Sequence, residues 1–175
     1  IAKDNPDLFS TILNFKSPVI SKFILDLSLK KNFSLTLSDD HLVLLIQTRC
    51  RVITNSICEI TAITDRIANL SYDNKTKVLE SILHLGESRF FKIMMNYPAL
   101  RECFHINFNG FFEKAITTSS IELLKLCFEN KPSEIKNLNF FFAFVLVERN
   151  VDVFNFIIKK IDKLPEDFNK VLNQE

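Results

Sequence analysis

Three apolar segments in the second half of this chain share one arrangement of polar residues. In each segment the polar positions are spaced by three and then by four residues: Arg89, Lys92, Asn96; Glu122, Lys125, Glu129; Asp152, Asn155, Lys159. This spacing places the three positions on one narrow face of an α-helix. Because the intervening residues are apolar, the pattern predicts that only this stripe faces water and that neighbouring elements bury the rest of each helix.

The segments recur about every 33 residues, so that residues 82–95, 115–128 and 145–158 align. A period of this length is typical of a solenoid built from helical hairpins. We predict an all-α fold, an α-solenoid of about five stacked hairpins. The second helices are expected to begin near Ser17, Asn55, Glu87, Ser120 and Asn150, in units near 5–30, 39–70, 75–97, 109–130 and 138–162.

The first two units follow the pattern less closely than the others. Unit one retains Lys22 and Asp26 of the stripe, but Val19 interrupts it, and unit two does not show the stripe when Asn55 is taken as its start. Residues 52–67 are also compatible with one long helix. Ser38, followed by two aspartates, is a predicted N-cap.

Several residues predict where the helices end. Pro98, Pro132 and Pro165 follow the second helices as chain breaks. Asn96, Asn130 and Asn150 are expected at helix ends or turns, where Asn tolerates the left-handed conformation. No low-complexity linker divides the chain, so residues 1–175 are expected to form one domain. The chain begins with Ile1 and ends within a predicted helix at 166–175, so we expect it to be a piece of a longer protein.

Composition narrows the classes of function. The net charge is +1, with no basic stripe, which argues against nucleic acid as a partner. Only two glycines accompany 18 phenylalanines, which disfavours phosphate-binding loops and tight β-hairpins. The longest apolar run, 140–147, is too short to cross a bilayer, so no membrane insertion is expected.

No group of residues in the sequence forms a convincing catalytic or metal site. The four cysteines include no closely spaced pair, and we interpret them as buried reduced thiols, as in a cytoplasmic protein: Cys50, Cys58, Cys103 and Cys127. Cys103 and His105, in an expected loop, lack further ligands for zinc. Asp39, Asp40 and His41 are better explained by helix capping. We predict that the segment is not an enzyme, needs no cofactor and has no evident small-molecule substrate.

The repeat resembles the ankyrin family, most clearly from about 75 to 162. Ala115-Ile116 is similar to the family's alanine pair in the first helix, Ser119-Ser120 and Gly86 to its turn, and Leu123-Leu124 to its leucine-rich second helix. The resemblance implies hairpins joined by loops. The family's Thr-Pro-Leu-His motif and the glycine that closes the second helix are absent, so another α-hairpin solenoid, such as a tetratricopeptide-like array, remains an alternative. Phe- and Asn-rich degenerate arrays also resemble effectors that intracellular bacteria secrete into the host cytosol.

The resemblance also implies a binding face. Phe112 and Phe142 take inward positions, whereas Ser81, Lys114 and Phe144 take a variable position expected on the exposed concave face. The residues predicted to contact a partner are Lys114, Thr117, Phe141, Phe144 and Glu148. Aromatic residues on such a face suit protein binding. For the helix containing Phe144, however, the favoured interpretation is an internal interface against an adjoining domain or the next repeat.

Two functions follow from these expectations. The first is a protein–protein interaction module, whose partner is a host protein if the chain is a bacterial effector. The second is a structural or regulatory repeat domain of a larger enzyme whose catalytic part lies outside this segment.

Overall fold

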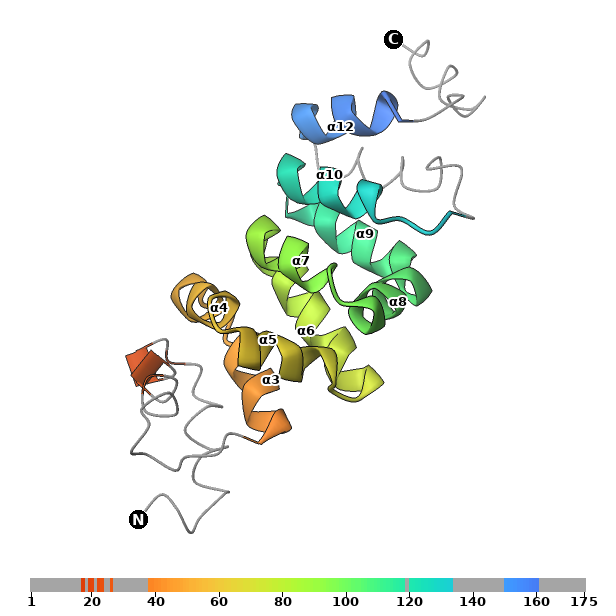
Figure 1. Ribbon diagram of the computed structural model, residues 1–175. Helices are drawn as coiled ribbons and strands as arrows, with labels where there is room; N and C mark the ends of the chain where they lie inside the picture. Colours follow the sequence, from red (N-terminus) through yellow and green to blue (C-terminus); the bar gives the residue numbers. More distant parts are fainter. Residues whose placement is uncertain are drawn as a thin grey trace, which may run out of the picture.

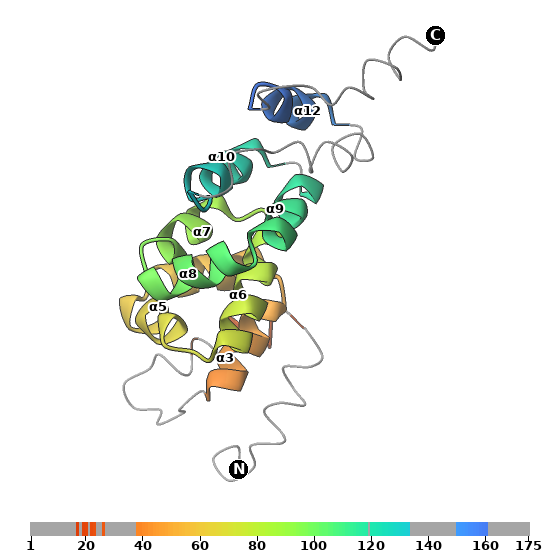
Figure 2. The same ribbon diagram turned by 90° about the vertical axis from the view of Figure 1, so that its right-hand side faces the viewer.

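The computed structural model describes residues 38–118, 120–133 and 150–160, and the single positions 17, 19, 20, 22, 23 and 26. Within these residues the ordered elements are all helices: α3 (Asp39–Gln47), α4 (Arg51–Cys58), α5 (Thr61–Ala68), α6 (Tyr72–Leu85), α7 (Ser88–Met94), α8 (Pro98–Ile106), α9 (Phe108–Thr117), α10 (Ile121–Glu129) and α12 (Val151–Ile158). They follow one another along an elongated array (Figures 1 and 2). In this part of the chain no helix is long and apolar enough to span a membrane.

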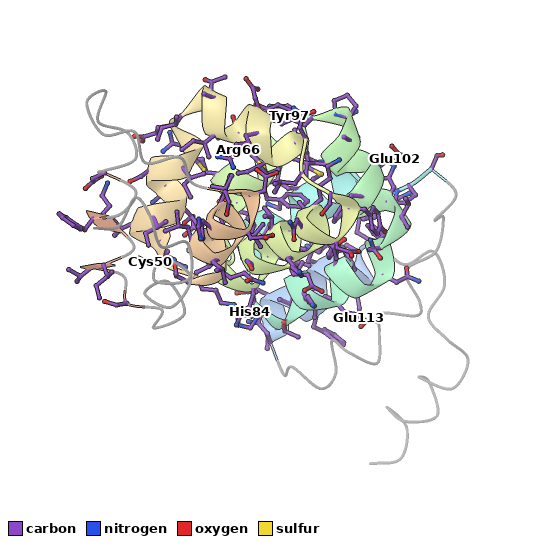
Figure 3. All side chains as sticks on the ribbon, turned by 90° about the horizontal axis from the view of Figure 1, so that it is seen from below. Cys50, Arg66, His84, Tyr97, Glu102 and Glu113 are labelled. Atoms are coloured by element: carbon purple, nitrogen blue, oxygen red, sulfur yellow. The ribbon has the colours of Figure 1, made fainter. Side chains whose placement is uncertain are left out.

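The helices form layers that run along the array. The first helices of successive units, α3, α6 and α9, contact one another in that order, and so do the second helices α4, α7, α10 and α12. The third helices, α5 and α8, occupy another edge. Viewed from below, Arg66 of α5 and Tyr97 at the start of α8 lie at one edge, and His84 of α6 and Glu113 of α9 lie at the opposite edge (Figure 3).

The second helices confirm the predicted polar stripe. The N-caps of α7, α10 and α12 are Glu87, Ser120 and Asn150, the positions at which these helices were expected to begin. All nine predicted stripe residues of these helices are exposed. The apolar positions between them supply core residues: Phe90, Phe91, Met94; Leu123, Leu124, Cys127; Val153, Ile157.

The predicted start of the second helix in unit two is wrong. Helix α4 has Cys50 as its N-cap, so Asn55 lies inside the helix. With the correct start, the stripe positions are Val52, Asn55 and Glu59, and all three are exposed. A valine therefore stands at the first stripe position, which hid the pattern in the sequence. The alternative of one long helix over 52–67 is also wrong, because α4 ends at Cys58 and α5 begins at Thr61.

The connections between the hairpins differ from the expected loops. Helices α5 and α8 fill them, so each of these units contains three helices. Pro98 ends the preceding segment, as predicted, but it is also the first residue of α8. Proline suits this position because its missing N–H would have no helical partner there. Cys103 and His105 consequently lie in a helix and not in a loop.

The helix caps confirm one prediction and correct another. Ser38 caps α3: its hydroxyl accepts a hydrogen bond from the His41 N–H, and the His41 ring accepts one from the Ser38 N–H. Asn130 and Asn150 stand at helix ends as expected, but with φ of −100° and −96° they are not left-handed. The left-handed residue that ends α6 is Gly86, with φ of 68°.

Phenylalanine forms the centre of the core where α7, α8 and α9 meet. The Phe104 ring lies 5.2 Å from that of Phe91, 5.6 Å from Phe108 and 5.8 Å from Phe111, measured between centroids. Phe112, predicted to face inward, is fully buried and stacks 5.2 Å from Phe108. Aromatic rings bury large apolar areas and add favourable edge and stacking contacts. This cluster makes α8 part of the core.

Several predicted features lie outside the described residues. These are most of the unit near 5–30, the first helix of the unit near 138–162, including Phe142, and the helix at 166–175. Lys22 and Asp26 of unit one are described, and they form an ion pair of 2.7 Å.

Candidate interaction surface

The structure describes two of the five residues predicted to contact a partner. Lys114 and Thr117 both lie on α9, and Thr117 is exposed and donates its hydroxyl to the Lys114 carbonyl oxygen at 2.8 Å. The Lys114 side chain is 42% exposed and its Nζ lies 2.6 Å from Oε1 of Glu80 on α6. Phe141, Phe144 and Glu148 lie outside the described residues.

Ser81 and Lys114, which align in the repeat, differ in exposure to solvent. Ser81 was expected on an exposed face, but it is only 4% exposed and its hydroxyl donates to the Lys77 carbonyl oxygen. Helix α6 packs between α3 and α9, and these neighbours cover the side of α6 on which Ser81 lies. The prediction of an exposed position is therefore wrong for Ser81 and holds only in part for Lys114.

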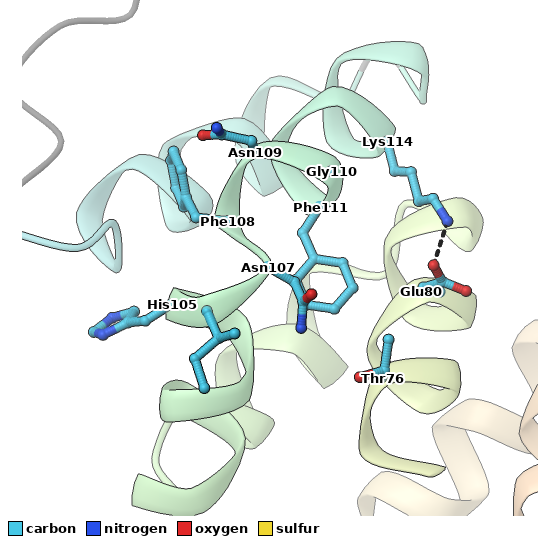
Figure 4. Close-up of a pocket in the computed structure, with 10 residues that line it drawn as sticks. Thr76, Glu80, His105, Asn107, Phe108, Asn109, Gly110, Phe111 and Lys114 are labelled. Carbon is cyan, nitrogen blue, oxygen red and sulfur yellow. Dashed lines mark hydrogen bonds and ion pairs between the residues drawn. The ribbon is translucent and has the colours of Figure 1, made fainter. Parts of the chain in front are cut away.

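Lys114 lines a groove between α6 on one side and the end of α8 and the start of α9 on the other (Figure 4). The groove has a volume of about 460 Å³. Thr76 and Glu80 line it from α6, and Phe111 and Lys114 line it from α9. The Glu80–Lys114 ion pair closes one end of the groove, where α6 and α9 face each other.

Hydrogen bonds hold the remaining walls of the groove. Asn107, between α8 and α9, donates its amide to the Tyr72 hydroxyl at 2.6 Å and to the Cys103 carbonyl oxygen at 3.2 Å. The Thr76 hydroxyl lies 3.4 Å from Cys103 Sγ. His105 Nε2 lies 2.8 Å from the Asn130 carbonyl oxygen, and since a carbonyl only accepts, this nitrogen carries the proton. The groove is thus tied to α6, α8 and the end of α10.

Apolar side chains are exposed beside these polar groups. Ile106, which lines the groove, is 64% exposed, and Tyr72 at the start of α6 is 46% exposed. At Gly110, also in the lining, an added Cβ would have no neighbour within 4 Å, so this side of α9 is open. Exposed apolar residues rimmed by polar ones are a common feature of protein-binding surfaces.

Polar contacts one repeat apart connect the units, and the sequence analysis missed them. Besides Glu80–Lys114, the pairs are Arg51–Glu87, Glu59–Arg89, Asp40–Asn74, Thr64–Tyr97 and Tyr72–Asn107. Their partners are 30 to 36 positions apart in the numbering, which is the repeat length. Complementary residues at that separation were the available signal. Ile106, in contrast, had no recognisable signal, because α8 was expected to be a loop.

The structure separates the two residues considered for zinc. Residues two apart point to nearly opposite sides of a helix. Accordingly, Cys103 Sγ faces Thr76 of α6, whereas His105 Nε2 faces Asn130 at the end of α10. Among the described residues no group of three or more His, Cys, Asp or Glu side chains is placed to hold a metal ion.

The thiols in the described part of the chain occupy packing positions. Cys58, Cys103 and Cys127 are buried, and Cys50 is half-buried. Burial disfavours the thiolate, so it raises the pKa of Cys58 from 9.0 to about 12 and also raises the pKa values of Cys103 and Cys127. Since the thiolate is the nucleophilic form, these three residues are poor nucleophiles near neutral pH.

Comparison of this chain with protein-family models, with curated proteins and with solved structures finds no match.

Proposed function

We propose that this chain is a non-catalytic protein–protein interaction module that presents a surface on stacked helical repeats to a partner. The observation that carries the proposal is the groove between α6, α8 and α9, where exposed Ile106 stands beside the Glu80–Lys114 pair. An ankyrin-like origin of the array, a cytoplasmic location and a role as a secreted effector remain parts of the proposal that rest on the sequence resemblance.

The proposed mechanism is display of a preformed surface. The groove walls come from α6, α8 and α9, which all contribute buried residues to one hydrophobic core, so little ordering is required when a partner binds, and preorganisation of this kind favours affinity. Ile106 would contribute apolar contact area. Glu80 and Lys114 would exchange part of their mutual contact for polar groups of the partner, which favours specificity over affinity.

The test compares two exposed apolar residues on different surfaces. Ile106 in the groove and Val52 on the α4 stripe are similarly exposed, at 64% and 59%. We expect Ile106→Asp to abolish retention of a protein captured by the wild-type chain, and Val52→Asp to retain it. A captured protein is then purified and its affinity for each variant is measured by titration calorimetry.

A second variant tests the ion pair within the groove. Lys114→Glu places two carboxylates side by side, and the double change Glu80→Lys with Lys114→Glu restores a pair with reversed direction. If the partner contacts the charged groups of Glu80 and Lys114, both variants bind it more weakly than the wild type does. Equal affinity of wild type, Ile106→Asp and Lys114→Glu for the purified partner would show that this groove is not the binding surface.

A further inference from the structure

A second cavity is lined by residues of α10 and α12 and of the segments that follow them. Helices α10 and α12 lie towards one end of the array (Figures 1 and 2). Its volume is about 360 Å³, which is ample for one or two side chains. The lining residues of the described chain are Lys125, Phe128, Glu129, Lys131, Phe156 and Lys160. Two aromatic rings are therefore combined with three lysines and one carboxylate.

The base of this cavity is aromatic and partly exposed. The Phe128 and Phe156 rings meet edge to face, with centroids 6.4 Å apart. Phe128 is half-buried, whereas the residues at the same position of α7 and α4, Met95 and Cys58, are buried. At this repeat position, the α10–α12 junction therefore offers aromatic surface that α4 and α7 do not.

Positive charge is concentrated around the Phe128 ring. The ammonium groups of Lys131 and Lys160 lie 5.6 Å and 4.8 Å from its centroid, which is cation–π distance. In the described residues neither Lys125 nor Lys160 lies within ion-pair distance of a carboxylate. The like charges of Lys125 and Lys160 at one cavity repel each other. An anion in the cavity would reduce this repulsion.

We propose that the α10–α12 cavity binds an acidic segment of a partner protein in which an apolar side chain lies between carboxylates. The apolar side chain packs on Phe128 and Phe156, and the carboxylates pair with the surrounding lysines. Lysine suits this role because its ammonium is a mobile point charge that follows carboxylates of varied geometry. This proposal and the proposed function both assume that the partner is a protein. They are otherwise independent, since the groove and the α10–α12 cavity have no lining residue in common.

The experiment measures binding of a defined probe to the 175-residue chain. The probe is a fluorescein-labelled peptide, Glu-Glu-Leu-Glu-Glu, followed by fluorescence anisotropy, with Gln-Gln-Leu-Gln-Gln as the uncharged reference. We expect the acidic peptide to bind and the uncharged one not to bind. Binding should weaken as salt rises from ~0.05 to ~0.5 M, because exposed charges are then screened.

The variants use equivalent positions of neighbouring repeats. Lys125→Glu and Lys160→Glu should each weaken binding about tenfold, since reversing one charge changes the interaction by about 1–2 kcal/mol at a solvated site. Lys92 of α7 occupies the repeat position of Lys125 and is also exposed, so Lys92→Glu is the matched control and should bind as the wild type does. Circular dichroism verifies that each variant is folded.

Several results would overturn the proposal. Absence of peptide binding, or an equal loss in Lys92→Glu, would leave only a general attraction between charges. Tighter binding of single-stranded polyuridine through the same lysines would assign the cavity to nucleic acid, and binding of a phosphoserine peptide but not of the acidic one would assign it to phosphate. Ile106→Asp, which alters the groove, should not change binding of the peptide to the cavity. Failure of the cavity proposal is therefore distinguishable from failure of the proposed function.

Discussion

The second helices and the third helices of this array differ in how regularly they are built. In α4, α7, α10 and α12 the same three positions after the N-cap are exposed, and the positions between them enter the core. The third helices, α5 and α8, bury residues at the same spacing (Thr64, Ile67, Ala68 and Leu100, Cys103, Phe104), but the residue types differ, and one helix begins with threonine and the other with proline. Regular sequence therefore marks only one layer of the structure.

The difference follows from the neighbours of each layer. Helices α7 and α10 each pack between second helices of adjacent units and contact their own hairpin partners, α6 and α9, so they meet similar surroundings. Helix α5 mainly contacts α4, whereas α8 contacts α6 and α9. Because burial decides which residues a position accepts, equal surroundings produce a repeating pattern and unequal surroundings do not.

The strongest test of this comparison is whether α8 belongs to the core. Phe104→Ala removes the ring that contacts Phe91, Phe108 and Phe111, and we expect a loss of about 3–5 kcal/mol in the free energy of unfolding. Phe128→Ala, at a half-buried ring of α10, should cost clearly less. Urea denaturation measures both. Equal costs would mean that α8 covers the core without being part of it.

The register of α4 is tested within one helix. Ile57 is fully buried and Asn55 lies on the exposed stripe. Ile57→Ala should destabilise the protein by about 2–5 kcal/mol through the lost contacts and the cavity left behind. Asn55→Ala should change stability by less than about 0.5 kcal/mol. Thermal unfolding monitored by circular dichroism gives the comparison, and a reversed order would reject the register described for this unit.

Replacing each of the two glycines by alanine should change the stability of the protein in opposite directions. Gly86 ends α6 at φ 68°, so Gly86→Ala should cost about 1–2 kcal/mol, although the added Cβ meets nothing closer than 3.7 Å. Gly110 lies within α9 with open space around it, and Gly110→Ala should stabilise the protein by about 0.5–1 kcal/mol. Denaturant midpoints measure both changes. Changes of equal sign would contradict the left-handed cap at Gly86.

The smallest expected effect concerns the contact between the two third helices. The Tyr97 hydroxyl donates to Asp65 at 2.9 Å and lies 2.8 Å from Thr64 Oγ1. Tyr97→Phe removes both contacts, and we expect a cost of about 0.5–1.5 kcal/mol because the Thr64 hydroxyl keeps its bond to the Thr61 carbonyl oxygen. Chemical denaturation is again the measurement. A neutral result would show that the third helices are joined by packing alone.

The candidate surface was predictable only in part. Lys114 was identified from the repeat and lines the groove, whereas Thr117, also identified, lies on α9 outside the groove lining. The rest of the groove was not identifiable, because Ile106 and Asn107 belong to a segment read as a loop and Glu80 acquires its role only through its contact with α9. Ser81 shows the limit of the repeat as a guide, since an aligned position can be covered by a neighbouring helix.

By itself, the sequence determined that the described part of the chain is helical, how long its repeat is, and which face of α7, α10 and α12 meets water. These properties depend on the order of polar and apolar residues along one helix, which a sequence displays directly. The tertiary structure alone decided that α5 and α8 are helices, that α4 begins at Arg51, and that Phe104 lies at the centre of the core. Those properties depend on which helices become neighbours, and contacts between distant residues arise only when the units stack.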